Sequence, residues 1–180
     1  KMNYWKLQIR NGDTGENFVD EALNDNRITT HEDYAQGFLE QAKEGDIVLI
    51  HKGAYPECLV KIKYKINNPS EINGTSFGHD YKVEVISWYK DVYNNKNIFD
   101  IPFIVGHNGT FTLLYNQSNT LMQVKKWHHY FLKLGEMEKN INLLRYKKQI
   151  ILQGPPGTGK TRKAKKIADE ILNVNPQNFT

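Results

Sequence analysis

The stretch DIVLIHKGAYPECLVKIKYKI, residues 46–66, decides the fold of the N-terminal part of the chain. Residues 46–53 form a short apolar run that ends at a glycine, which is typical of a buried strand. Residues 58–66 alternate between polar, mostly lysine, positions and apolar positions, which indicates a strand with one buried face and one exposed face. The two runs predict that this part of the chain is mostly β-structure.

Further strand patterns lie on both sides of these runs. YWKLQI (4–9) is rich in aromatic and β-branched residues, and DIPFIVGHNGTFTLLYN (100–116) predicts two short strands about a turn. YKVEVISWYKDVY (81–93) alternates as well. Strict alternation puts two pairs of its side chains on opposite faces: Val83 and Val85 on one, Ile86 and Trp88 on the other.

Three segments have helical patterns. One is expected to begin after Thr30, which has Asp33 three residues on in a capping-box arrangement, and to end at Gly45. Residues 124–148 carry apolar side chains at spacings of three and four, and Gly135 is expected to divide them into two helices. Residues 160–174 form the third helix, with Ala164, Ile167, Ala168 and Ile171 turned inward. QIILQ (149–153) is expected to be a buried strand before it.

Composition limits the classes of protein to consider. The chain has 180 residues, 39% of them hydrophobic, and a net charge of +4, which allows a buried core and an anionic partner. Cys58 is the single cysteine, so no internal disulfide and no cysteine-built zinc site is possible, and a cytoplasmic location is expected. No apolar run is long enough for a membrane span, so no membrane partner is expected.

The motif with the clearest chemistry is GPPGTGKT, which matches the phosphate-loop pattern G-x-x-x-x-G-K-[ST]. Small residues let backbone N–H groups wrap a phosphate, and the helix that follows presents its positive end to it. The lysine contacts the β- and γ-phosphates and the threonine hydroxyl binds Mg²⁺. The predicted nucleotide-binding residues are Gly154, Pro155, Pro156, Gly157, Thr158, Gly159, Lys160 and Thr161, with Thr161 as the Mg²⁺ ligand.

The sequence of this motif resembles the phosphate-loop sequence of the AAA+ ATPases. Hydrolysis also needs an acidic strand end, a sensor and an arginine from a neighbour, and these do not fit into the nineteen residues after Thr161. The sequence is therefore expected to be a truncated piece of the protein, inactive in NTP turnover, with GTP or ATP and Mg²⁺ as cofactors of the full-length protein. No catalytic residue is assigned.

The N-terminal part resembles the EVE-like and YTH-like domains of the PUA superfamily. The resemblance rests on an aromatic first strand, on Gly45-Asp46 before an apolar strand, and on a late strand with Val83, Val85 and Trp88. Such a domain before an AAA+ loop is similar to the McrB-type subunits of modification-dependent (type IV) restriction systems. The implied fold is α+β: a small curved β-barrel with flanking helices over 1–132, a linker helix over 133–148, and the first strand, loop and helix of an AAA+ domain over 149–180.

The resemblance implies that the N-terminal domain holds a flipped methylated adenine or cytosine of DNA in an aromatic cage, without a cofactor of its own. Trp88 is the first candidate for the cage, and an ordinary core position is its alternative. Trp5 and Tyr34 are further candidates, but core packing is the favoured alternative for both, whereas Tyr55 is a loop aromatic without an evident core role. The remaining pocket candidates close the strand that ends at residue 53: His51, Lys52 and Gly53.

The resemblance further implies an McrC-like nuclease as partner and a hexameric ring of the full-length protein, whereas the present chain is expected to be a monomer. Lys61, Lys63 and Lys65 are expected to follow a nucleic-acid backbone or to be merely solvated. Two other functions stay open: a PUA-like module that binds RNA or a protein, and a P-loop kinase with an additional β domain.

Overall fold

The computed structural model describes residues 2–9, 19–30, 41–67, 79–106, 111–115 and 118–174. The chain divides into two compact units, Lys1–Tyr130 and Phe131–Thr180. The helix expected between Thr30 and Gly45 lies outside the described residues over 31–40. Residues 41–45 are described and are not helical, and Lys43 N bonds to the Asp46 carboxylate instead. The first unit is an α+β structure built on a curved sheet.

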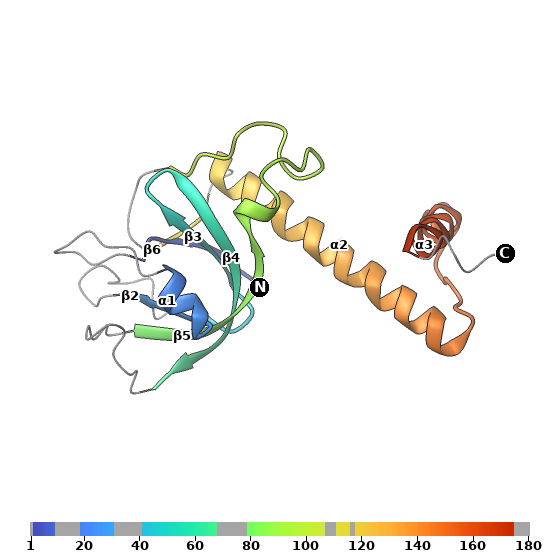
Figure 1. Cartoon of the computed structure of the whole chain (residues 1–180), viewed down its shortest axis with the longest axis horizontal. Coiled ribbons are helices and arrows are strands. Elements are labelled where there is room, and N and C mark those ends of the chain that lie inside the picture. Colours follow the sequence, from blue (N-terminus) through green and yellow to red (C-terminus); the bar gives the residue numbers. More distant parts are fainter. Residues whose placement is uncertain are drawn as a thin grey trace. The chain divides into compact units, whose positions relative to one another are not determined.

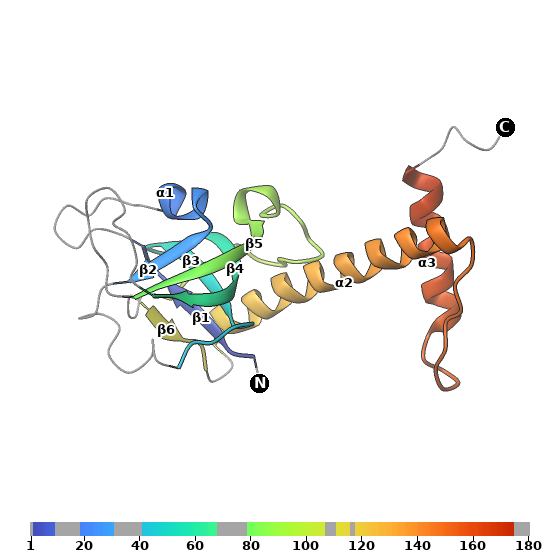
Figure 2. The ribbon, with the colours of Figure 1, turned by 90° about the horizontal axis from the view of Figure 1, so that it is seen from below.

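The sheet has six strands in the order β2-β5-β4-β3-β1-β6. Their bounds are β1 (Tyr4–Leu7), β2 (Arg27–Thr30), β3 (Ile47–Lys52), β4 (Tyr55–Ile66), β5 (His79–Trp88) and β6 (Phe111–Leu113). β1 pairs with β3 in parallel and every other recorded pairing is antiparallel. Figures 1 and 2 show the strands curling about a hollow side, on which the short helix α1 (Val19–Asn24) lies.

The concave face of the sheet, called the inner face below, carries the main hydrophobic core. Because side chains alternate along a strand, every second residue of β1, β3 and β4 points into this core. The buried members on the strands are Trp5, Leu7, Ile28, Val48, Ile50, Cys58, Val60, Ile62, Tyr81, Val83 and Phe111, together with Ile9. Val19, Ala22 and Leu23 attach α1 to the same core.

The opposite, outer face of the sheet is buried as well. Ile47, Leu49 and Leu59 are fully buried there. The first part of α2 (Asn119–Lys147) lies against this face, since Tyr4 Oη and His128 Nδ1 are 3.1 Å apart. Burial lowers the pKa of His128, with smaller contributions from Lys61 and His129. The strand alternation therefore serves two cores, one on each face.

An aromatic cluster extends the outer core beyond the sheet. Tyr89 follows β5 in a short 3-10 helix (Tyr89–Asp91), and its ring lies 5.9 Å from that of Trp127 on α2. Phe99 and Phe103 complete the cluster. This packing explains why 100–106 is not a strand, contrary to the sequence prediction of two strands in 100–116. The segment buries Phe103 in the cluster and makes a backbone bond from Val105 N to Ala54 O instead of pairing in a ladder.

A buried carboxylate joins β1 to β3. Asp46, 1% exposed, accepts hydrogen bonds from the indole Nε1 of Trp5 (2.9 Å), from Asn3 N (2.8 Å) and from Lys43 N (3.2 Å). Gly45 before it has a φ of 87°, a conformation that favours glycine, and its N–H bonds to Ile62 O. The Gly45-Asp46 pair therefore sets where β3 begins relative to both neighbouring strands.

The second unit consists of the C-terminal part of α2 and of α3 (Lys160–Val174), joined by residues 148–159. Gly135 does not divide α2, because an exposed glycine inside a helix costs only about 1 kcal/mol. Residues 149–153 do not form the expected buried strand: Ile151 is 81% exposed. A strand needs a neighbour for its backbone hydrogen bonds, and this unit has no strand among its described residues.

The orientation predicted for Trp88 is wrong, and a β-bulge explains why. The register between β4 and β5 shifts between Leu59 and Val60, so that Val85 is opposite Val60 and Trp88 is opposite Cys58. The additional residue of β5 reverses the alternation. Trp88 consequently packs against the inner core together with Val85, and not on the opposite face.

No helix among the described residues is sufficiently long and apolar to span a membrane.

We predict that Asp46→Ala lowers the free energy of unfolding by about 3 kcal/mol or more, because it leaves the buried Trp5 indole and two backbone N–H groups without their acceptor. Chemical denaturation followed by circular dichroism measures the loss. Asp46→Asn keeps one acceptor oxygen and should lose less. Asp91→Ala on the exposed 3-10 helix is the control, expected within about 0.5 kcal/mol of the parent. Equal stability of Asp46→Ala and the parent would contradict the role given to this carboxylate.

Candidate functional site

The loop between 154 and 159 adopts the conformations that its glycines allow. Gly157 and Gly159 have φ values of 79° and 71°, in the left-handed region that other residues avoid. A Cβ on Gly154 would lie 3.0 Å from the hydroxyl of Thr158. The Thr158 hydroxyl donates a 2.8 Å hydrogen bond to Pro155 O, which closes the turn. The glycines of the motif thus stand at positions where the backbone conformation or the close approach of Thr158 favours glycine.

Lys160 lies across the loop that precedes it. Its ammonium donates hydrogen bonds to Gly154 O (2.8 Å) and Pro155 O (2.7 Å), and lies 3.4 Å from Thr158 Oγ1. These partners are neutral carbonyl and hydroxyl oxygens. A phosphate brought into the loop offers the same ammonium charged acceptors, which make stronger hydrogen bonds. The lysine is therefore held at the loop by bonds that an anion can replace.

The first turn of α3 completes the loop. The helix begins at Lys160, so the N–H groups of its first residues have no acceptor within the helix and carry its positive end. No acidic residue lies in this turn. Thr161 is exposed and can offer its hydroxyl to a Mg²⁺ ion bound with phosphate. Within the described residues, no three His, Cys, Asp or Glu side chains gather into a metal site.

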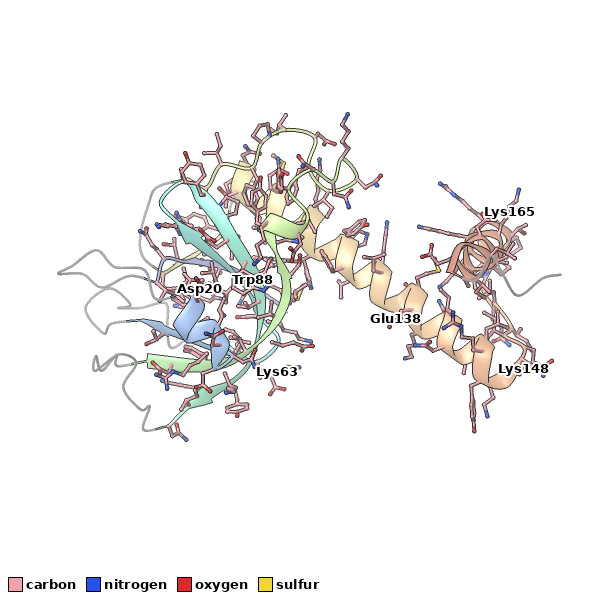
Figure 3. The ribbon with its side chains drawn as sticks, viewed as in Figure 1. Asp20, Lys63, Trp88, Glu138, Lys148 and Lys165 are labelled. Atoms are coloured by element: carbon pink, nitrogen blue, oxygen red, sulfur yellow. The ribbon has the colours of Figure 1, made fainter. Side chains whose placement is uncertain are left out.

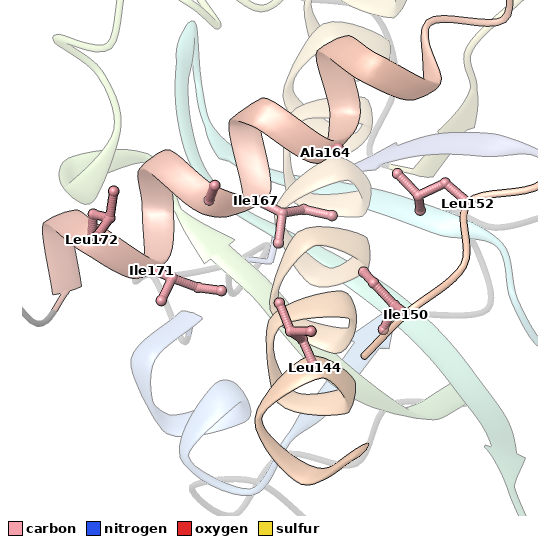
Figure 4. A pocket seen from close by; sticks show the side chains of 8 residues that line it. Leu144, Ile150, Leu152, Ala164, Ile167, Ile171 and Leu172 are labelled. Carbon is pink, nitrogen blue, oxygen red and sulfur yellow. The ribbon is translucent and has the colours of Figure 1, made fainter. Parts of the chain in front are cut away.

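An apolar groove of 360 Å³ separates α3 from the segment before the loop. Figure 4 shows the side chains of Leu144, Ile150 and Leu152 pointing toward Ile167 and Ile171 across it. Ile167 is buried, whereas Ala164 and Ala168, predicted to turn inward, line the groove and remain exposed. Lys163 of α3 also forms an ion pair with Glu136 of α2. These contacts position the loop within the second unit.

In the first unit, Trp88 ends a row of side chains across the inner face. The register places Phe111 opposite Leu7, Leu7 opposite Ile50, Ile50 opposite Cys58 and Cys58 opposite Trp88. The first four side chains are buried, whereas Trp88 is only half-buried. Figure 3 shows Trp88 at the end of β5. Its indole therefore joins the core and keeps part of its surface open.

The open part of Trp88 has a cation next to it. The Lys90 ammonium lies 5.3 Å from the centre of the indole ring, a cation–π contact that is not among the sequence predictions. The signal for it was present, because an exposed lysine follows Trp88 by two residues at the end of the strand. No aromatic ring among the described residues stacks on Trp88. The described residues thus contribute one ring and one cation here, and not a closed box of rings.

Two of the predicted pocket residues lie inside the protein. Trp5 is fully buried, stacks on Phe111 at a centroid distance of 5.0 Å and donates to Asp46, so it is a core residue and offers no face to a base. His51 is 2% exposed, with Nδ1 2.8 Å from Gly53 O. The burial of Trp5 agrees with core packing, the alternative that the sequence favoured for it, and the burial of His51 leaves its side chain without an exposed face.

The other pocket candidates lie at the hairpin between β3 and β4. Gly53 has a φ of 56°, which the tight turn requires, and Lys52 is exposed beside it. Tyr55 is 75% exposed. Tyr34 lies outside the described residues. Of the described cage candidates, Trp5 and His51 are thus buried, Lys52 and Tyr55 are exposed, and Trp88 is half-buried.

The three lysines of β4 lie on an exposed surface. Lys61, Lys63 and Lys65 are all exposed, and Lys63 forms an ion pair with Glu84 on β5. That bond lowers the pKa of Glu84. Figure 3 labels Lys63 on this edge of the first unit. Exposed pairs of this kind are weak, so the lysines are available to an anionic partner.

No protein-family model matches the chain, and no curated protein sequence matches it either.

We predict that Trp88 protects the thiol of Cys58. Burial, and to a lesser degree the neighbouring Glu57, raises the pKa of Cys58 to about 12, so the thiol stays protonated and unreactive in the folded protein near pH 8. Trp88→Ala should open the end of the inner core and speed the reaction with a disulfide reagent at least about tenfold, because the residues are cross-strand neighbours on one face. The chain has one cysteine, so the signal is specific.

The exposed Tyr55→Ala is the matched control and should react as slowly as the parent. Equal rates for Trp88→Ala and the parent, with both folded, would show that the indole does not cover the inner core.

Proposed function

We propose that the chain combines a modified-base recognition module with the phosphate-binding part of an AAA+ NTPase, as in the McrB-type subunits that it resembles. The observation that carries the proposal is the loop at 154–159 closed under the Lys160 ammonium, directly before the N-terminus of α3. Loop, lysine and helix end are the three parts that a nucleoside triphosphate requires for its phosphates.

The nucleotide would displace the contacts that the lysine makes with its own loop. Lys160 would turn its ammonium from Gly154 O and Pro155 O to phosphate oxygens, while Thr161 would bind Mg²⁺. The nucleotide is GTP or ATP, and GTP follows from the McrB resemblance. The residues at the loop hold the phosphates; they contain no group that activates water, so hydrolysis belongs to further parts of an AAA+ domain.

The half-exposed Trp88 supports the recognition function of the first unit. A base lifted out of a duplex loses its stacking, and an indole face replaces about 1–3 kcal/mol of it. Lys90, 5.3 Å from the ring centre, adds a positive charge next to that face. The exposed lysines of β4 suit the phosphates of the same strand, a contact without sequence preference.

The remaining parts of the proposal follow from the resemblance. The substrate is DNA with methylated adenine or cytosine, an McrC-like nuclease is the partner, and the AAA+ parts of several copies assemble into a ring. In that arrangement the first unit selects the DNA on which the motor acts.

We predict that Lys160→Ala weakens binding of a Mg²⁺–nucleoside triphosphate by about 10–100-fold, because it removes a charge-assisted bond to phosphate. Titration with a fluorescent GTP or ATP analogue measures the dissociation constant. Lys165→Ala removes an exposed lysine of the same helix outside the loop and is the matched control. Retention of full affinity in Lys160→Ala would contradict nucleotide binding by this loop.

We predict further that the chain prefers duplexes that contain N6-methyladenine or 5-methylcytosine, and that Trp88→Ala reduces this preference to near unity. Loss of one stacked base corresponds to about 5–150-fold in affinity. Fluorescence anisotropy with matched modified and unmodified duplexes measures both constants. Binding that depends on salt alone should remain in the variant.

Trp88→Phe keeps an aromatic face and should retain most of the preference, which separates loss of stacking from loss of the fold. Lys63→Ala should weaken all duplexes equally. Equal affinity of the parent chain for modified and unmodified duplexes would refute modified-base recognition. A preference for RNA strands would favour the PUA-like RNA-binding alternative.

A further inference from the structure

A small cavity lies on the outer face of the first unit, where β1, β6 and the start of α2 meet. Its volume is 180 Å³, and Lys6, Gly106, Tyr115, Ser118 and Thr120 contribute to its wall. These five residues belong neither to the phosphate loop nor to the inner face that carries Trp88, although Leu113, which also lines the cavity, packs against the inner core. The polar groups of the cavity are therefore distinct from those of the sites described above.

Lys6 is an unusual residue for such a position. It is 5% exposed, because it points from β1 to the covered face of the sheet, and its ammonium donates a hydrogen bond to Gly106 O. No carboxylate among the described residues forms an ion pair with it. A buried charge is costly unless an opposite charge or several hydrogen bonds compensate it. Burial accordingly lowers the pKa of Lys6.

The start of α2 brings further donors to the same cavity. Ser118 Oγ accepts a hydrogen bond from Leu121 N (3.2 Å), and Thr120 Oγ1 accepts one from Gly106 N (3.3 Å). Both hydroxyls keep their hydrogen for another acceptor. The helix has 29 residues and no acidic residue in its first turn, so its positive end is not neutralised locally. Cation, hydroxyls and helix end all favour a bound anion.

One wall of the cavity is aromatic. Tyr115 is 61% exposed and lies at its rim. An exposed ring beside a phosphate-sized cavity suits an anion that carries a flat apolar group, because bases stack on aromatic side chains. An inorganic anion can bind only in the cavity, whereas a nucleotide can place its phosphate in the cavity and stack its base on the Tyr115 ring.

We propose that the cavity around Lys6 binds a phosphate group through the Lys6 ammonium, the hydroxyls of Ser118 and Thr120 and the N-terminus of α2, and that the base attached to this phosphate stacks on Tyr115. The phosphate belongs to a free nucleotide or to a nucleic-acid strand. This site adds a second phosphate contact to the chain and does not depend on Trp88 or on the phosphate loop.

The experiment uses the full chain with Lys160→Ala, so that the phosphate loop does not contribute. Thermal unfolding is followed with increasing sodium phosphate against sodium chloride at equal ionic strength, and the amide signals of Gly106 and Thr120 are followed by NMR. A saturable rise of the melting temperature with phosphate alone, together with shifts of these two signals, is expected. Absence of both effects would overturn the proposal.

Lys6→Met in the same background keeps the buried chain of methylenes and removes the charge. It should abolish the phosphate-specific stabilisation, whereas Lys126→Met, which removes an exposed lysine of α2 outside the cavity, should keep it. Undiminished phosphate binding by Lys6→Met would overturn the proposal. Thr120→Val serves as a second variant if Lys6→Met does not fold, and it should weaken phosphate binding severalfold.

Two further arms identify the source of the phosphate. Tyr115→Ala should leave the affinity for inorganic phosphate unchanged and weaken that for adenosine monophosphate or a short thymidine oligonucleotide by about 5–150-fold. Tighter binding of the oligonucleotide than of the mononucleotide supports a nucleic-acid strand, and the reverse supports a free nucleotide. Equal losses for inorganic phosphate and nucleotide would overturn the role of Tyr115. Because all ligands are unmodified, failure here leaves the recognition of modified bases by Trp88 untouched.

Discussion

The hydrogen bonds to the buried carboxylate of Asp46 are the constraint on which the first unit depends. β1 and β3 pair in parallel, and a parallel pair cannot be closed by a hairpin. The chain must return over a long connection, and Asp46 fixes the register at the end of it by holding Asn3 N and the Trp5 indole. Once Trp5 points inward, the alternation of β1 directs Lys6 to the outer face.

This constraint links the two candidate sites of the first unit. The inner face ends at Trp88, which reaches the core because a bulge in β5 reverses its alternation. The outer face holds Lys6 under the start of α2, next to hydroxyls and without a carboxylate among the described residues. A half-exposed indole suits a base, and a buried ammonium suits a phosphate. The two faces of one sheet thus carry an aromatic ring and an ammonium group, which match the base and the phosphate of a nucleotide.

The parts of the fold that sequence could predict are those set by neighbours along the chain. The two strands of 46–66 followed from a short apolar run and from alternation, and the turn at the loop followed from a motif whose geometry is local. Trp88 was assigned to the wrong face because a single bulge shifts the alternation, and nothing in VEVISW shows where the additional residue lies. The role of Asp46 depends on atoms 41 and 43 residues away, which no local pattern contains.

The segment before the phosphate loop, residues 149–153, also shows that a local pattern does not decide the structure alone. QIILQ has the composition of a buried strand, yet Ile151 is 81% exposed and the segment is irregular. Ile150 and Leu152 of this segment turn to α3 and form one wall of a groove, whereas Ile151 does not line it. The loop nevertheless keeps its conformation, because its bonds are internal: Thr158 to Pro155, and Lys160 to Gly154 and Pro155. The conformation of the loop is thus encoded in a few consecutive residues, whereas QIILQ has no neighbouring strand among the described residues of this unit and forms no ladder.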